Sequence, residues 1–131
     1  MIGLDTNVVV RYIMQDDPKQ SPKATRLIES LTSDAPGFVP LVAVVELVWV
    51  LESSYRLDCD QVAVALDLLL RSKEIIIDRA DLVLQAQRRY ASGGADFADA
   101  LIERIAHAQG CTATMTFDTG AARNAGMTLL P

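Results

Sequence analysis

The chain has 131 residues, half of them hydrophobic, and a formal net charge of −5. This length and composition predict a single domain over residues 1–131 with a sizeable core. The acidic balance argues against a protein that coats nucleic acid through a basic surface.

The longest apolar run, residues 41–51, is interrupted by Glu46. It is far shorter than the roughly 20 residues of a membrane span, so we expect a cytoplasmic protein without membrane contact. No signal peptide is indicated, because Met1 leads directly into an expected strand. Cys59 and Cys111 lie in apolar surroundings without metal-ligand spacing, which favours small core residues in a reducing compartment over a disulfide framework.

Short apolar segments alternate with longer, mostly amphipathic ones along the whole chain. The expected elements are a strand at 2–4, helices at 6–15 and 21–31, a strand at 38–39, helices at 41–54 and 61–72, a strand at 75–77, helices at 79–91 and 96–110, a strand at 111–117, a helix at 121–125 and a strand at 127–130. This alternation predicts an α/β fold, a three-layer sandwich in which helices flank a mostly parallel central sheet of four to five short strands.

Some of these assignments leave alternatives open. The β-branched residues 8–10 are compatible with a strand, but Asp5-Thr6-Asn7 is typical of a helix start. Ser21 followed by Pro22 predicts an N-cap and a first helical residue. The helix at 41–54 is apolar nearly all round, which predicts a helix that is mostly core and buried on several sides, with a dimer face as a second role for residues such as Trp49.

An unusual helix start lies at residues 94–102, between a glycine-rich break and the helix that runs to about Gly110. Asp96 and Asp99 lie three residues apart on one face of the first turn, close enough to repel each other or to share a cation. Taken alone, the pair is also explained by Asp96 as the N-cap and Asp99 near the positive end of the helix.

Three further acids are expected near the same edge of the sheet. Asp5 ends the first strand, Asp118 ends the fourth, and Glu46 lies early in the helix after the second. Ligands of open parallel sheets bind beyond the carboxyl ends of the strands. If the first and fourth strands are neighbours, all these carboxylates reach one crevice. Glu46 has few structural explanations in an apolar helix, because buried Glu is rare unless it is paired.

Several carboxylates in one crevice cannot all ionise without compensation, because like charges raise one another's pKa. A hard divalent cation compensates them, and oxygen ligands without His or Cys favour Mg²⁺ or Mn²⁺. Ions held in this way are the usual machinery for hydrolysing phosphodiesters. The only histidine, His107, lies in the last turn of a helix, where a structural role is favoured over acid–base chemistry with a second histidine.

Four segments carry a family resemblance: residues 2–7, Val45-Glu46-Leu47, residues 96–102 and Thr116-Phe117-Asp118. Together they resemble the PIN-domain ribonucleases and, more narrowly, the VapC toxins of bacterial toxin–antitoxin modules. The resemblance covers essentially the whole chain. It implies a metal-dependent endoribonuclease that cuts RNA, forms a homodimer and is neutralised by a VapB-type antitoxin.

The resemblance also assigns site residues. The catalytic quartet matches Asp5, Glu46, Asp99 and Asp118, and the metal ligands match Asp5, Asp96, Asp99 and Asp118. Candidate substrate contacts are Thr6, Asn7, Arg11 and Thr116. Thr6 and Asn7 are equally well explained as helix caps. Two positions depart from the family pattern: Pro40 replaces an expected Ser or Thr cap, and Thr119-Gly120 stands where relatives often carry basic residues.

Three rival functions are compatible with a fold of this class. The first, a catalytically dead binding module that keeps the fold, is disfavoured by the intact acids. A phosphoacceptor receiver domain needs an acceptor Asp after a mid-chain strand, where only Asp78 qualifies, and a Lys on a late strand, where none exists. A housekeeping RNA-processing nuclease of the same fold is also compatible with these residues. A small antitoxin-like reading frame upstream would distinguish a toxin from that alternative.

Overall fold

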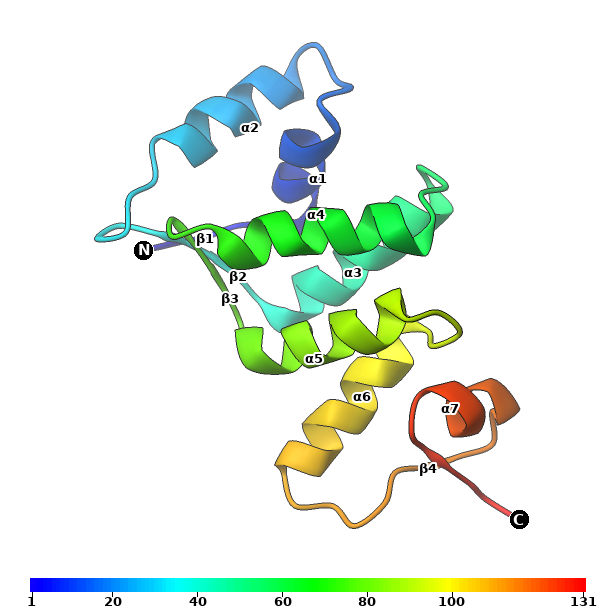
Figure 1. Cartoon of the computed structure of the whole chain (residues 1–131). Helices are drawn as coiled ribbons and strands as arrows, with labels where there is room; N and C mark the ends of the chain where they lie inside the picture. Colours follow the sequence, from blue (N-terminus) through cyan, green and yellow to red (C-terminus); the bar gives the residue numbers. More distant parts are fainter. The chain divides into compact units, whose positions relative to one another are not determined.

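Seven helices and five short strands alternate along residues 1–131 in the computed structural model (Figure 1). Residues 1–80 form an N-terminal unit and residues 81–131 a C-terminal unit. The N-terminal unit contains β1 (Ile2–Gly3), α1 (Thr6–Met14), α2 (Gln20–Glu29), β2 (Gly37–Val39), α3 (Leu41–Ser53), α4 (Cys59–Arg71) and β3 (Ile75–Ile77). The C-terminal unit contains α5 (Ala80–Ala91, beginning at the boundary), α6 (Phe97–Ala108), β4 (Met115–Thr116), α7 (Thr119–Asn124) and β5 (Thr128–Leu129).

The sheet of the N-terminal unit is parallel throughout and has the strand order β1-β2-β3. Gly37 lies in the central strand opposite Ile2 and Ile75. A Cβ at Gly37 would lie 2.7 Å from Leu4 Cδ1 and 2.9 Å from Leu31 Cδ1. Glycine is therefore needed here because the neighbouring leucines approach the backbone closely.

The helices of this unit bury one face each. α1 packs against α2 and α3, while α4 packs against α3 and β3. The fully buried side chains of the unit are Val9, Val39, Val44, Leu47, Leu51, Val62, Leu66 and Leu69. α4 begins with a capping box in which Asp58 Oδ1 accepts from the Gln61 N–H at 2.9 Å and Gln61 Oε1 accepts from the Asp58 N–H at 3.0 Å.

In the C-terminal unit, a turn through Gly93 and Gly94 joins α5 to α6, and both glycines have positive φ angles. The rings of Tyr90 and Phe97 meet edge to face across this turn, with centroids 5.9 Å apart. β4 and β5 pair in parallel and are connected by α7, which packs against both. His107 lies in the last turn of α6, as predicted.

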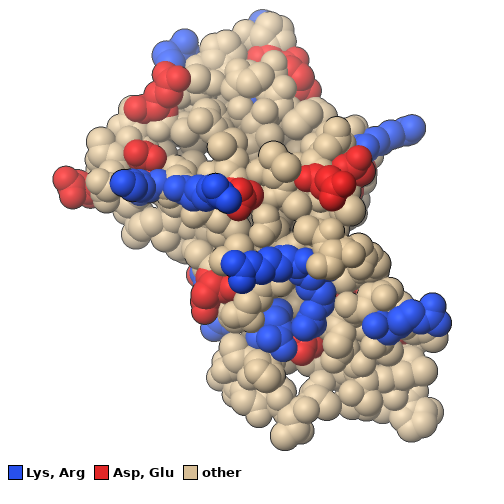
Figure 2. Space-filling view, in the orientation of Figure 1, with Lys and Arg blue, Asp and Glu red and all other residues tan.

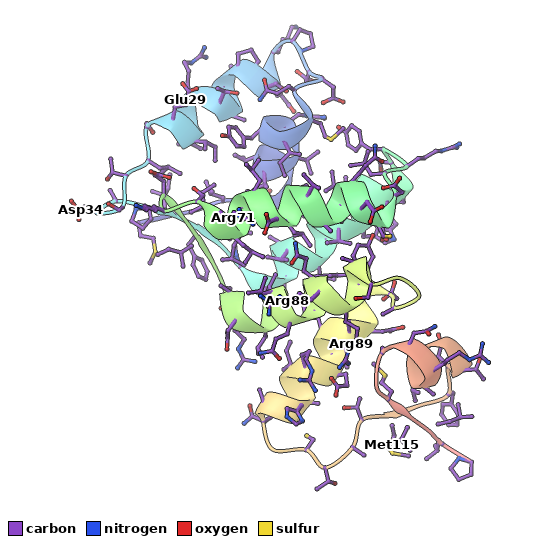
Figure 3. The ribbon with its side chains drawn as sticks, viewed as in Figure 1. Glu29, Asp34, Arg71, Arg88, Arg89 and Met115 are labelled. Carbon is purple, nitrogen blue, oxygen red and sulfur yellow. The ribbon has the colours of Figure 1, made fainter.

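One charged side chain is buried in the molecule, and it belongs to this unit. Glu103 of α6 is 9% exposed. Its Oε2 accepts from Arg104 Nε at 2.6 Å and from Arg89 Nη1 at 3.1 Å. Arg89 Nη1 also donates to the Ala125 carbonyl at 2.8 Å, at the C-terminal end of α7. Figure 3 shows Arg89 at the end of α5, next to α6. This network links α5, α6 and α7.

The α/β class and the parallel strands are confirmed, with the five strands divided between a sheet of three and a sheet of two. The expected strand at 111–117 forms only at Met115–Thr116. Residues 111–113 are exposed, so their β-branched content has no packed surface to support a longer strand. The helix at the start of the chain is also confirmed, and its strand alternative is wrong. The single domain over 1–131 stays a prediction.

Three expectations about burial and caps are wrong. Ser21 is not an N-cap; it lies inside α2, and Asp17 Oδ1 instead accepts from the N–H groups of Lys19 and Gln20 at 2.9 and 2.7 Å. Cys59 is only half-buried and Cys111 is exposed, because both lie at helix ends rather than on packed faces.

The third correction concerns α3. Val42 is 80% exposed and Trp49 is 64% exposed, so the helix is not buried on several sides. Only the stripe that contains Val44, Leu47 and Leu51 enters the core. None of the helices has the length and apolar content that crossing a membrane would require.

Candidate functional site

Asp5 is the N-cap of α1 and follows directly after β1. Its Oδ1 accepts from the Thr6 N–H at 2.8 Å, and its carbonyl accepts from the N–H groups of Val8 and Val9 at 3.1 and 3.3 Å. The second carboxylate oxygen, Oδ2, has no hydrogen-bond partner. The strand-to-helix turn therefore fixes the Asp5 carboxylate at the carboxyl end of a parallel strand and leaves one oxygen available.

Thr6 and Asn7 follow in the first turn of α1, so the alternative that they cap this helix is wrong. Thr6 is buried, with 6% of its surface exposed, whereas Asn7 is exposed. Asn7 faces an open pocket of about 730 Å³ in the N-terminal unit, which we call the acidic pocket. Its lining includes Asp5, Thr6, Asn7, Arg11, Asp16, Glu46 and Tyr55.

Glu46 reaches this pocket from α3. The side chain is exposed, so the explanation based on a buried and unpaired Glu does not apply. Asp5 and Glu46 also line a second, adjoining depression of about 350 Å³ together with Pro40. The structure therefore brings Asp5 and Glu46 to a common concave surface, as the sequence predicted for this pair.

The departure at Pro40 has a structural solution. Pro40 supplies no side-chain cap to α3, but Asp78 Oδ2 accepts from the Leu41 N–H at 3.1 Å. Asp78 follows β3, and the Asp78 N–H donates to the Val39 carbonyl at 3.0 Å, so β3 carries this carboxylate to the start of α3. Asp78 is thereby a structural cap, which also removes the only candidate acceptor of the receiver-domain alternative.

The C-terminal unit contains the other three acids. Asp96 is the N-cap of α6, and its Oδ1 accepts from the Asp99 N–H at 3.0 Å, as predicted. Asp118 is the N-cap of α7, and its Oδ1 accepts from the N–H groups of Gly120 and Ala121 at 2.7 and 3.1 Å. Thr116 Oγ1 accepts from the Asp118 N–H at 3.0 Å, so this hydroxyl positions Asp118.

Asp99 differs from its neighbours because it caps no helix. Burial, and then the charges of Asp96 and Asp118, raise the pKa of the Asp99 carboxyl above its usual value. These three carboxylates therefore interact electrostatically within the C-terminal unit.

The donor chemistry fits a hard divalent cation. Asp5, Asp96 and Asp118 each use Oδ1 for a backbone cap, which leaves the Oδ2 oxygen of each available to a cation and oriented by the helix start. Neither unit has three or more Asp, Glu, His or Cys side chains already grouped as a metal site. The expectation that all five acids share one crevice stays a prediction.

The surface charge agrees with the composition. Figure 2 shows acidic and basic side chains interspersed over the visible face of the N-terminal unit, without a broad basic surface. The sequence did not predict three polar features: the cap that Asp78 provides, the contacts of Arg11 with Tyr55 and with Asp16, and the burial of Glu103. Each depends on residues distant in sequence or on burial that spacing does not reveal, although the isolated Tyr55 after an apolar helix was a visible signal.

Comparison with known protein families identifies a PIN domain over residues 2–127. A search of curated proteins finds no match to the chain. PIN domains are generally nucleases and typically use a divalent metal ion. The matched residues include all five acids and run through both units of the chain. The chain belongs to the PIN-domain family.

Proposed function

We propose that this protein is a Mg²⁺- or Mn²⁺-dependent endoribonuclease and the toxin of a VapBC-type toxin–antitoxin system. The PIN-domain match over residues 2–127 carries the nuclease part of the proposal. The toxin part is supported by the resemblance of the segments around Asp5, Glu46, Asp99 and Asp118 to VapC proteins.

In this proposal the catalytic residues are Asp5, Glu46, Asp99 and Asp118, and the metal ligands are Asp5, Asp96, Asp99 and Asp118. When bound, the ion supplies Lewis acidity that activates water and stabilises negative charge on the phosphodiester. The protein holds the carboxylates in place through helix starts, and Thr116 holds Asp118. Thr6, Asn7 and Arg11 are proposed to contact RNA, Asn7 and Arg11 from within the acidic pocket.

The proposed partners are RNA, a VapB-type antitoxin and a second copy of the chain, in the cytoplasm. Exposed apolar side chains on α3 and α4, namely Val42, Trp49, Val64 and Leu68, support the presence of a protein partner because water-exposed apolar area favours association. The net charge of −5 favours a basic antitoxin segment.

The nuclease proposal is tested by incubating the purified protein with a mixed RNA pool and Mg²⁺, Mn²⁺ or EDTA. We expect cleavage with either ion, none in EDTA, and products with 5′-phosphate and 3′-hydroxyl ends, because water attacks phosphorus. Asp99→Asn serves as the inactive control. Cyclic 2′,3′-phosphate ends, or undiminished cleavage in EDTA, would refute the proposal.

A further inference from the structure

The acidic pocket contains one basic and one aromatic side chain, Arg11 and Tyr55. Arg11 comes from the middle of α1 and Tyr55 follows the end of α3. The pocket volume of about 730 Å³ lies in the range of pockets that bind small organic ligands. Asp5 and Glu46 line the same pocket, so any ligand bound there lies beside two of the proposed catalytic acids.

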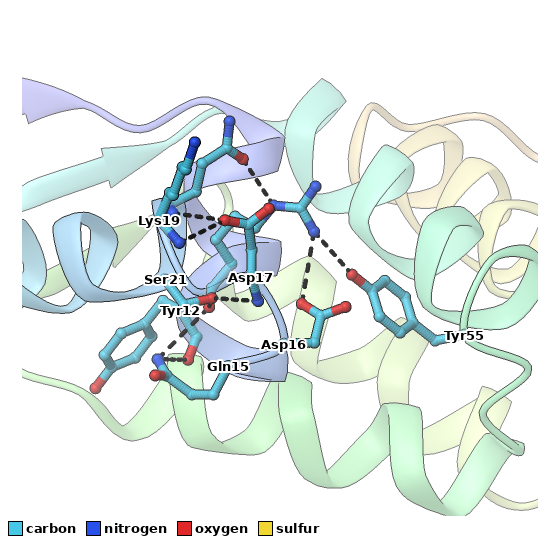
Figure 4. A network of polar contacts seen from close by, with 9 residues as sticks. Tyr12, Gln15, Asp16, Asp17, Lys19, Ser21 and Tyr55 are labelled. Atoms are coloured by element: carbon cyan, nitrogen blue, oxygen red, sulfur yellow. Dashed lines mark hydrogen bonds and ion pairs between the residues drawn. The ribbon is translucent and has the colours of Figure 1, made fainter.

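Arg11 is held by contacts from three segments. Its Nε donates to Gln20 Oε1 at 2.8 Å, and its Nη1 donates to the Tyr55 hydroxyl at 3.1 Å and lies 3.5 Å from Asp16 Oδ1 (Figure 4). The other terminal nitrogen, Nη2, has no partner in the protein. A guanidinium held in this way loses little conformational freedom when it binds a ligand, and its remaining donors suit a phosphate oxygen.

Tyr55 is fixed by the same contacts. Burial, and then hydrogen bonding to Asp16, raise the pKa of the Tyr55 hydroxyl, so the phenol stays neutral. Its hydroxyl accepts from Arg11, which restricts the orientation of the ring. A neutral aromatic ring held in one orientation is a suitable surface on which an unpaired base can stack.

The charges of the pocket decide between ligand classes. The carboxylates of Asp5, Asp16 and Glu46 outnumber the single guanidinium of Arg11. These carboxylates repel an anion in the absence of a cation, and a phosphodiester is accepted once a divalent cation bound at Asp5 offsets their charge. Stacking on Tyr55 adds a contact that a phosphate alone does not make.

We propose that Arg11 and Tyr55 form a nucleotide subsite in which Arg11 holds a backbone phosphate of the RNA and Tyr55 stacks one base beside the cleaved bond. Asp16 and Gln20 are positioning residues that act through Arg11. This subsite rests on the proposed nuclease function and adds Tyr55 to it as a residue that determines where the RNA is cut.

The test uses single-turnover cleavage, with Mg²⁺, of a short RNA whose cleaved bond has been mapped. A series of RNAs carries one abasic ribose at successive nucleotides on either side of that bond. For the wild-type protein, one abasic position should weaken apparent binding by about 5- to 100-fold, the range expected for loss of one stacked base. Tyr55→Leu should weaken binding of the intact RNA similarly and should be insensitive to that abasic position.

Arg11 is tested by salt dependence. Arg11→Gln should reduce the magnitude of the slope of log apparent affinity against log salt concentration by about 0.7, the value for one phosphate contact with a single strand. Tyr55→Phe retains the ring but removes its hydroxyl contact with Arg11, so it should keep the abasic sensitivity and raise the apparent Kd.

Tyr12→Leu and Arg71→Gln are matched controls, because both side chains line a different pocket of the same unit. Melting temperatures show which variants fold. If Tyr55→Leu does not fold, Tyr55→Phe still tests the stacking. The subsite is wrong if Tyr55→Leu retains the wild-type abasic response, if Tyr55→Phe loses it while folded, or if Arg11→Gln leaves the salt slope unchanged. Mg²⁺-dependent cleavage by the wild-type protein in the same assay would still support the nuclease function.

Discussion

The ionised form of Asp99 is disfavoured in the folded protein, and no neighbouring positive side chain offsets this. Burial, and then the charges of Asp96 and Asp118, raise the pKa of its carboxyl, and Asp99 caps no helix that would offset this effect. An acid whose pKa is raised in the folded state binds protons more tightly there than in the unfolded chain. Its contribution to stability therefore falls as pH rises through the window between the two pKa values, and the ionised form destabilises the metal-free protein at pH 7.

Removing the Asp99 charge should raise the stability of the metal-free protein and abolish RNA cleavage. Asp99→Asn preserves size and removes the repulsion, so we expect a higher melting temperature than wild type in EDTA at pH 7, with cleavage lost by orders of magnitude. Mg²⁺ should raise the melting temperature of wild type more than that of the variant, because the variant lacks one proposed ligand. Thermal melts with and without Mg²⁺ test this, and a lower melting temperature for the variant in EDTA would contradict the repulsion.

Asp96 is expected to respond differently, because its Oδ1 caps α6. Asp96→Asn keeps a good cap and should fold well while losing less activity than Asp99→Asn. Asp96→Ala should in addition cost about 1 kcal/mol of folding free energy from the lost cap. Cleavage rates and melting temperatures with titrated Mg²⁺ test this ranking. Equal inactivity of Asp96→Asn and Asp99→Asn at saturating metal would make Asp96 a primary ligand instead.

At the scale of secondary structure, the acids that carry the proposed chemistry also start helices. Asp5, Asp96 and Asp118 cap α1, α6 and α7, so each carboxylate is oriented by the backbone that it stabilises. Asp78, at the end of β3, likewise accepts a hydrogen bond from the first backbone N–H of α3. The helix that carries Glu46 is therefore tied to the sheet at its first turn.

The Glu103 network is a charged link between helices of the C-terminal unit. Hydrogen bonding from Arg104 is the largest influence that lowers the pKa of Glu103, and it outweighs burial; the Arg89 charge and hydrogen bond act in the same direction. An acid with a lowered pKa contributes stability above its unfolded pKa, and this contribution is lost as pH falls through the folded pKa.

Glu103→Gln should therefore destabilise the protein at pH 7, on the order of 2 kcal/mol for hydrogen bonds to a charged group. The difference in melting temperature between wild type and variant should shrink as pH falls below the ordinary Glu pKa of about 4.3 and through the lowered pKa of the folded Glu103 carboxyl, because the wild-type side chain then also loses its charge. The control is Arg71→Gln, which removes an exposed pair with Asp67 and should cost only a few tenths of a kcal/mol. A difference that stays constant down to pH 2.5 would exclude the carboxylate charge as its cause.

At the scale of the whole molecule, periodicity and caps predicted most elements because both are local. The Asp96 cap and the 75–77 strand lie where the sequence placed them. Partners distant in sequence were not predictable: the Asp78 cap of Leu41 joins residues 37 apart, and Arg89, which contacts the buried Glu103, lies 14 residues before it. The apolar composition of α3 likewise concealed that Trp49 is exposed, because composition does not show which face the neighbouring helices α1 and α4 cover.

In the candidate site, too, local features were predictable and contacts between residues distant in sequence were not. The carboxylates of Asp5 and Glu46 line one pocket as predicted, since strand ends and helix starts of a parallel unit meet at one edge. Tyr55, which lies in that pocket, had no spacing pattern that tied it to Arg11, 44 residues earlier.

The exposed apolar residues of α3 and α4 and the acidic charge lead to a prediction about the partner. A basic antitoxin segment would be attracted to a protein of net charge −5, and an Arg or Lys side chain in the acidic pocket would compete with the cation that Asp5 is proposed to bind. Co-expression with the protein encoded directly upstream should restore growth and suppress RNA cleavage. Adding Mg²⁺ in excess to the purified complex should partly restore cleavage.

Asp99→Asn, expressed alone, is the control, because growth should then be normal without the partner. The complex should also weaken as salt concentration rises, since screening reduces the attraction between the basic segment and the acidic pocket. A stable complex that cleaves RNA at the full wild-type rate would show that the partner does not neutralise the enzyme. A wild-type protein that leaves growth unaffected would instead favour the housekeeping nuclease, because a toxin must harm the cell when its antitoxin is absent.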